Sequence, residues 1–113
     1  MIQIYHNPRC AKSRAGLSYL KTKVQDIEVI DYIKTGLTTD MLHQLLQRLN
    51  MKPFELIRIQ EVYFKQKLKG KFFSDEEWIQ IIVENPKLLK RPIIVHNYKA
   101  VLADTTDITD RII

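Results

Sequence analysis

The hydrophobic and polar positions at the start of the chain predict a strand, a helix and a second strand. Ile2 and Ile4 mark one face of a strand over residues 1–6, and apolar residues recur at helical spacing over residues 11–22. Residues 27–31 alternate between apolar and polar side chains, as a half-buried strand does. Two strands joined by a helix in so short a segment run parallel in one sheet, so we expect a βαβ unit here.

The middle of the chain is predicted to be mostly helical. Gly36 supplies a turn, and Thr38 or Thr39 caps a helix over residues 39–50. The remaining expected elements are a short helical turn from Pro53, a helix over 59–68 with Val62, Tyr63 and Leu68, and a short helix over 87–90. The lysine-rich stretch 65–71 around Gly70 is expected to be a solvated loop.

One helix in this middle region has a clear start and stop in the sequence. Ser74 and Glu77 form a capping-box pattern ahead of a helix over residues 75–84, and Asn85-Pro86 ends it. We expect this helix to bury Trp78, Ile81 and Ile82.

The last part of the chain predicts a β-hairpin followed by a helix. Residues 91–96 form a strand, residues 97–99 a tight turn and residues 100–103 the antiparallel return strand. Residues 104–113 form a final helix or helical tail, capped by a Thr or Asp.

This order of elements favours an α/β, thioredoxin-like fold. It is βαβ, then helices, then ββα, which gives a four-stranded mixed sheet with an inserted helical segment at about residues 38–90. At 113 residues, the chain is expected to form a single domain over 1–113. In that fold the proline that opens the third strand is typically cis and lies beside the thiol, so we expect a cis Arg91-Pro92 bond.

Composition narrows the classes of function. A single cysteine excludes an internal disulfide framework and is typical of a reducing, cytoplasmic setting. Pro8, Arg9 and Lys12 interrupt any early apolar run, so we expect no secretory signal, and no stretch reaches the ~18 apolar residues of a membrane span. Basic residues give a net charge of +5 but are spread without aromatic interleaving, which argues against nucleic acid as a partner. Three scattered histidines and one cysteine have no metal-ligand spacing.

The strongest candidate for chemistry is Cys10, which lies between the first predicted strand and the first predicted helix. The unpaired N–H groups and positive dipole end of a helix favour a thiolate there. Arg9, Lys12 and Arg14 add positive charge, and Ser13 offers a hydroxyl about one helical turn further on. A lone cysteine is often only a small buried apolar residue, but such residues rarely lie between Pro-Arg and Ala-Lys-Ser-Arg. We therefore interpret Cys10 as a reactive thiol.

Three segments of the chain resemble one known family. Tyr5-His6-Asn7-Pro8-Arg9-Cys10-Ala11-Lys12-Ser13-Arg14 resembles the nucleophile loop of the glutaredoxin-linked arsenate reductase (ArsC-like) family. Glu55-Leu56-Ile57-Arg58 is similar to its central arginine segment, and the stretch from Asn85-Pro86 through Arg91-Pro92-Ile93-Ile94-Val95 to its second arginine-proline segment. The resemblance runs from residue 1 to about residue 112, in matching order. The Arg-Pro-Ile segment is shared with Spx-like transcriptional regulators of the same fold.

The resemblance implies a mechanism and a set of site residues. Cys10 is then the nucleophile that attacks arsenic, while Arg58 and Arg91 hold the oxyanion and stabilise the developing charge. Glutathione, as co-substrate, attacks the adduct, and glutaredoxin resolves the mixed disulfide, so that neither a bound cofactor nor a metal is needed. Supporting roles fall to His6, Asn7, Ser13 and Arg14, which tune or orient the thiolate loop, and to Pro92, the neighbour of the sulfur.

The chain departs from the family pattern after the return strand, where a third arginine followed by proline is usual. Asp104 and Thr105 stand at these positions. A carboxylate that faced the site would oppose an arsenate dianion; alternatively, Asp104 pairs with Arg58 or Arg91, or caps the last helix.

Three further functions therefore stay open. One is reduction of another thiol-bound substrate, such as a glutathione mixed disulfide. A second is an Spx-like regulator that binds RNA polymerase, although Ser13 replaces the second cysteine of the Cys-x-x-Cys switch that such regulators often carry. The third is a non-catalytic anion-binding or structural protein.

Overall fold

The computed structural model describes residues 1–113 and divides into two compact units. The first unit comprises Met1–Thr35 and Arg91–Ile113, and the second comprises Gly36–Lys90. The helical segment predicted at about residues 38–90 lies within the second unit.

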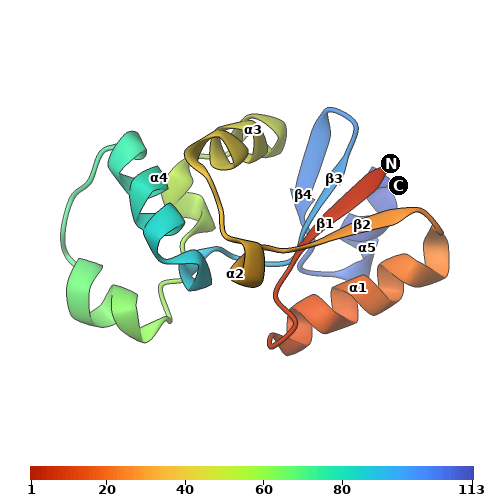
Figure 1. Ribbon diagram of the computed structural model, residues 1–113, viewed down its shortest axis with the longest axis horizontal. Helices are drawn as coiled ribbons and strands as arrows, with labels where there is room; N and C mark the ends of the chain where they lie inside the picture. Colours follow the sequence, from red (N-terminus) through yellow and green to blue (C-terminus); the bar gives the residue numbers. More distant parts are fainter. The chain divides into compact units, whose positions relative to one another are not determined.

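A four-stranded mixed sheet forms the centre of the first unit (Figure 1). Its strands are β1 (Ile2–His6), β2 (Ile27–Asp31), β3 (Ile93–His96) and β4 (Lys99–Leu102), in the order β2-β1-β3-β4. β1 and β2 are parallel, with Ile4 opposite Val29, whereas β1 and β3 are antiparallel, as are β3 and β4. The predicted βαβ unit, the hairpin and the mixed sheet are thus confirmed.

Two helices share a hydrophobic core with this sheet. They are α1 (Ala11–Lys23) and α5 (Thr106–Ile112); a third, short helix, α2 (Tyr32–Thr35), follows β2. The buried cluster joins residues of α1, of α5, of the strands and of the segment that follows β4: Ile2, Ile4, Leu20, Ile94, Ala103 and Ile112. Burial of these side chains fixes α1 on β1, and thereby fixes the loop between them.

The Arg91-Pro92 peptide bond is cis, as expected. The carbonyl of Pro92 accepts a hydrogen bond from the backbone N–H of Ala103 at 2.9 Å. On its other side the proline ring lies against α1 at Gly16, where a Cβ atom would stand only 2.7 Å from Pro92 Cγ. Glycine is therefore required at position 16 for α1 to approach the start of β3 this closely.

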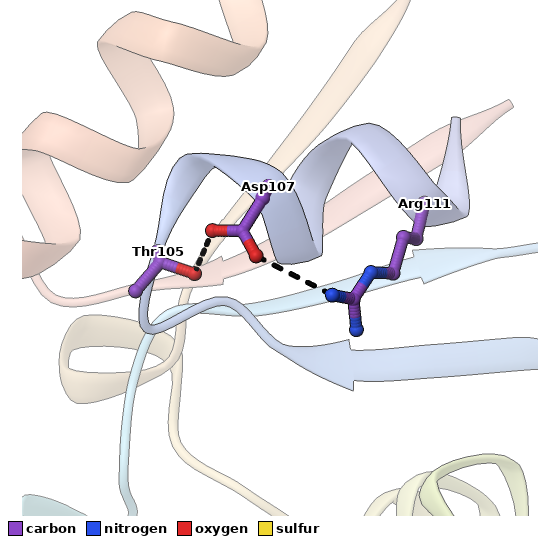
Figure 2. A network of polar contacts seen from close by, with 3 residues as sticks. All are labelled: Thr105, Asp107 and Arg111. Atoms are coloured by element: carbon purple, nitrogen blue, oxygen red, sulfur yellow. Dashed lines mark hydrogen bonds and ion pairs between the residues drawn. The ribbon is translucent and has the colours of Figure 1, made fainter.

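A small polar network organises the start of α5 (Figure 2). Thr105 occupies the N-cap position, but its hydroxyl donates to Asp107 Oδ1 at 2.6 Å and does not accept from the helix backbone. Asp107 Oδ2 also pairs with Arg111 at 3.4 Å. The hydrogen bond from Thr105 is the main reason why the pKa of Asp107 lies below its ordinary value. The final helix therefore begins at Thr106, two residues after the predicted start.

The second unit is helical, as predicted, and its caps follow the sequence signals. Its elements are α3 (Thr39–Leu49), η1 (Pro53–Leu56), η2 (Phe64–Leu68), α4 (Asp75–Glu84) and η3 (Pro86–Leu88). Thr38 Oγ1 accepts from the N–H of Met41 at 3.1 Å. Both halves of the Ser74–Glu77 capping box are present, and each satisfies one free N–H group of α4.

The stretch predicted as a helix over 59–68 differs from the prediction. Residues 59–61 form a turn, and helical structure begins at Val62 and widens into a π-helix, with the N–H of Lys69 donating to the carbonyl of Phe64. Val62 and Tyr63 are 65% and 42% exposed, whereas Phe64 and Leu68 are buried. The π-turn brings Phe64, and not its two predecessors, into the ring cluster with Phe54 and Trp78.

Two further expectations for this unit were wrong in part. The lysine-rich stretch begins on the π-helix and only its later part, from Lys69, is a loop, although its lysines are exposed. In α4 the buried side chains are Trp78, Ile79 and Ile82, so Ile79 takes the place predicted for Ile81.

Candidate functional site

Cys10 is the N-cap residue of α1 and ends the loop that leaves β1. Its backbone N–H donates to the carbonyl of Asn7 at 3.0 Å, and its carbonyl accepts from the N–H of Arg14 at 2.9 Å. The thiol is partly exposed, and the first turn of α1 carries no acidic residue. The side chain therefore stands at the positive end of a helix, where a negative charge is favoured.

The surroundings of Cys10 favour its thiolate. Partial burial alone would raise the pKa of the thiol, but the backbone N–H of Ser13 and the guanidinium of Arg91 outweigh this effect. Arg91 acts through both a hydrogen bond and its charge, and the N–H of Lys12 contributes as well. The net result is a pKa of Cys10 below its ordinary value. A lowered pKa increases the fraction of the thiol that is present as thiolate, which is the nucleophilic form.

Arg91 directly precedes the cis-proline and interacts with Cys10, which is far from it in the sequence. The two residues belong to the same unit, and Arg91 is only 8% exposed. A guanidinium beside the thiol suits the oxyanion-binding role predicted for Arg91, and that role stays a prediction.

Ser13 holds the loop between β1 and α1 from inside. Its side chain is fully buried, and its Oγ lies 2.7 Å from Nδ1 of His6 and accepts from the backbone N–H of Asn7 at 3.0 Å. Asn7 in turn accepts the N–H of Arg9 through Oδ1 at 3.0 Å. Three of the predicted supporting residues, His6, Asn7 and Ser13, are thus brought together behind Cys10.

His6 is buried, and burial is the main reason why its pKa lies below the ordinary value of a histidine. The charges of Lys21 and Arg14 act in the same direction, and Asp31 opposes them. A neutral imidazole suits a position whose Nδ1 faces a hydroxyl.

The other two supporting residues have separate contacts in the same unit. The guanidinium of Arg14 donates to the carbonyl of Pro8 at 3.0 Å, which braces the loop from the solvent side. Pro92 lies against Gly16 of α1.

Arg58 lies in the second unit, directly after η1 and Ile57. Its backbone N–H donates to the carbonyl of Leu88 at 2.7 Å. Its Nε and one terminal nitrogen both lie 3.3 Å from Oε2 of Glu61, and both side chains are mostly buried. Glu61 was not predicted from the sequence. The signal that could have identified it is an acidic residue three positions after the arginine, a spacing that allows an ion pair. An oxyanion-binding role for Arg58 stays a prediction.

Asp104 pairs with Lys12, a partner that was not predicted from the sequence. Lys12 Nζ donates to Asp104 Oδ1 at 2.8 Å. The N-cap of α5 is Thr105, so the alternative in which Asp104 caps the last helix is wrong. The carboxylate of Asp104 therefore lies beside the first turn of α1. Its partner there, Lys12, is two residues after Cys10 in the sequence.

The structure contains neither a metal-binding cluster nor a helix that could span a membrane. No group of three or more His, Cys, Asp or Glu side chains is arranged to hold a metal ion. No helix combines the length and the apolar character needed to cross a membrane.

Known proteins match the chain over nearly its whole length. Residues 5–107 match the ArsC family. The chain is 44% identical over 101 residues to the "Uncharacterized protein YfgD" of Escherichia coli (strain K12), with 88% of this chain and 85% of that protein covered. It is 33% identical over 101 residues to an arsenate reductase of Neisseria meningitidis serogroup B, with 88% and 86% covered. The structure of an arsenate reductase from Vibrio cholerae matches at a TM-score of 0.92 and 32% identity, covering 99% of this chain and 97% of that one. The predicted fold class is confirmed by this likeness.

Proposed function

The chain belongs to the ArsC family, and from this membership we propose that it is a thiol-dependent oxidoreductase of the arsenate reductase type, with Cys10 as its nucleophile. The family resemblance read from the Cys10 loop and the two arginine segments is confirmed. The observation that carries the proposal is the lowered pKa of Cys10, produced by the N–H groups of α1 and by Arg91.

The proposed reaction begins with the thiolate of Cys10. Its sulfur forms a bond to arsenic, and hydroxide or water leaves. Arg91, together with Arg58, balances the negative charge on the oxygens. Glutathione then attacks the adduct: two electrons pass to arsenic, arsenite leaves, and a disulfide joins Cys10 to glutathione. Glutaredoxin reduces that disulfide and restores the thiol. Because every other thiol comes from outside, the single cysteine of this chain suffices, and a reducing compartment such as the cytoplasm suits it.

The proposal also concerns which oxyanion the protein reduces. Asp104 places a negative charge beside α1, although its pairing with Lys12 partly neutralises that charge. Arsenate is the substrate named for the Neisseria and Vibrio relatives. A reductase of another thiol-bound species and an Spx-like regulator that binds RNA polymerase stay predictions.

An arsenate reduction assay with glutathione and glutaredoxin tests the proposal, run on the wild type, Cys10→Ser and Asp104→Arg. We expect arsenite formation by the wild type, none by Cys10→Ser, and faster reduction by Asp104→Arg. Activity that survives in Cys10→Ser would exclude the thiol mechanism. Inactivity of both the wild type and Asp104→Arg would exclude arsenate as the substrate.

A further inference from the structure

Arg58 lies at the end of a short backbone pairing inside the second unit. Its N–H donates to the carbonyl of Leu88 at 2.7 Å. Directly before it, Ile57 forms an antiparallel bridge with Leu89, and both of these side chains are buried. The main chain at Arg58 is therefore held by the core of the unit, so the conformational freedom of this residue lies in its long side chain.

Glu61 holds that side chain from the turn that follows Arg58. The N–H of Glu61 donates to the carbonyl of Arg58 at 3.2 Å, which closes the turn and brings the two side chains to the same side of it. Oε2 of Glu61 then lies 3.3 Å from both Nε and Nη2 of Arg58. The side chains of Arg58 and Glu61 are only 20% and 26% exposed, so water and salt screen this pair less than they screen a surface pair.

The contact engages one edge of the guanidinium group. A guanidinium is planar and carries five N–H donors, with Nε and Nη2 along one edge and Nη1 and Nη2 along another. Glu61 contacts the first edge and does not engage the second, which can donate to two oxygens of one oxyanion. Because one carboxylate oxygen contacts two nitrogens, rotation of the guanidinium out of its plane would weaken at least one contact. Glu61 therefore sets the direction in which the second edge points.

We propose that Glu61 is a positioning residue for Arg58: it holds the guanidinium by one edge, so that the other edge is presented to the oxyanion. The inference rests on the proposed function, in which Arg58 binds the oxyanion, and it adds a residue to that same site. An arginine side chain that is free in solution loses its rotamer freedom when an anion binds to it. A side chain that Glu61 already holds has lost this freedom beforehand, so the anion binds more tightly.

The carboxylate of Glu61 also has an effect of the opposite sign, because its negative charge repels the oxyanion. Two substitutions separate the two effects. Glu61→Gln keeps an acceptor oxygen on a side chain of the same length and removes the charge, whereas Glu61→Ala removes both. Positioning therefore predicts weaker anion binding in Glu61→Ala alone, and repulsion predicts tighter binding in both variants.

The test measures how arsenate protects Cys10 from iodoacetamide alkylation, without glutathione and at constant ionic strength. The arsenate concentration that halves the alkylation rate is determined for the wild type, Glu61→Ala, Glu61→Gln, Arg58→Gln and the double variant Arg58→Gln/Glu61→Ala. Far-UV circular dichroism establishes that each variant is folded. Glu55→Ala is the matched control, because Glu55 is an acidic residue three positions before Arg58 whose carboxylate accepts the backbone N–H of Lys52 instead.

We expect the half-protecting concentration to rise about fivefold in Glu61→Ala, the factor that corresponds to one immobilised arginine side chain. It should stay within about twofold of the wild type in Glu61→Gln and Glu55→Ala. In the Arg58→Gln background, Glu61→Ala should cause no further change, because Glu61 acts through Arg58.

Three results would overturn the inference and leave Cys10 as the proposed nucleophile. They are tighter or unchanged arsenate binding in Glu61→Ala, a fivefold loss that persists in the Arg58→Gln background, and an Arg58→Gln variant that binds arsenate as the wild type does. Absence of protection in the wild type at any arsenate concentration would overturn arsenate as the substrate in the proposed function together with the inference.

Discussion

Ser13 Oγ lies 2.7 Å from Nδ1 of His6, and this contact joins the end of β1 to the first turn of α1 beneath Cys10. Both side chains are buried, and the same hydroxyl also accepts the backbone N–H of Asn7. The loop that presents the thiol is therefore held by its own neighbours. Ser13 stands where a Cys-x-x-Cys motif would have its second cysteine, and its hydroxyl stabilises the loop at this position.

Removal of the Ser13 hydroxyl should weaken the protein. Ser13→Ala leaves the N–H of Asn7 and Nδ1 of His6 without their partner in a buried place, which costs about 1–3 kcal/mol in the free energy of unfolding. Urea denaturation measures this change. Ser18→Ala, at an exposed position of α1, is the control and should stay within about 0.5 kcal/mol of the wild type. Equal stability of the two variants would show that the buried contacts contribute nothing.

Gly16→Ala should also destabilise the protein, although alanine is the better helix former by about 1 kcal/mol. The added Cβ would stand 2.7 Å from Pro92 Cγ, so α1 or the start of β3 must shift. Overpacking of this kind costs about 1–3 kcal/mol, as urea denaturation can measure. A variant more stable than the wild type would mean that α1 and Pro92 are further apart than described.

Replacement of Arg91 should slow the reaction of Cys10. Arg91→Gln removes the guanidinium that lowers the pKa of the thiol, so this pKa should rise and iodoacetamide alkylation at pH 7 should slow about three- to tenfold. Arg14→Gln is the matched control, because Arg14 bonds the carbonyl of Pro8 and is not among the main causes of the lowered pKa of Cys10. If both variants react at the wild-type rate, Arg91 does not stabilise the thiolate.

His6 should make the protein sensitive to mild acid. Since burial lowers the pKa of His6, the unfolded chain takes up its proton at a higher pH than the folded chain does. The stability that His6 contributes is fully present above the unfolded pKa of about 6.5 and is lost as the pH falls through the folded value. Relative to His6→Gln, the wild type should therefore lose unfolding free energy as the pH falls from 7 to 5. Parallel stability curves for the two proteins would contradict this.

Much of the first unit could be predicted from the sequence, because its signals are local. The apolar positions Ile2 and Ile4 predict β1, and Cys10 could be placed at the start of α1 from the change of pattern alone. The partner of Asp104 could not be found this way. Its contact with Lys12 joins two residues 92 positions apart, and several basic residues were equally available to a reader of the sequence.

The second unit shows a different limit of sequence patterns. Its caps at Thr38 and Ser74 were predictable, because a capping hydroxyl acts within three residues. The π-helix at Phe64–Leu68 was not, because the apolar residues Val62, Tyr63 and Leu68 predicted an ordinary helix over residues 59–68. In α4 the apolar residues continue from Trp78 to Val83, except at Gln80, so the pattern did not identify which isoleucines face inward. Packing within the second unit determines that Ile79 and Ile82 are buried.

The most direct test of the account is the pH dependence of Cys10 alkylation in the wild-type protein. The N–H groups of α1 and the guanidinium of Arg91 lower the pKa of this thiol, so the midpoint of the rate against pH should lie clearly below the ~8.5 of a free cysteine. Cys10→Ser gives the background rate. A midpoint at or above ~8.5 would contradict the account, because the thiol would then lack the activation on which the proposed chemistry depends.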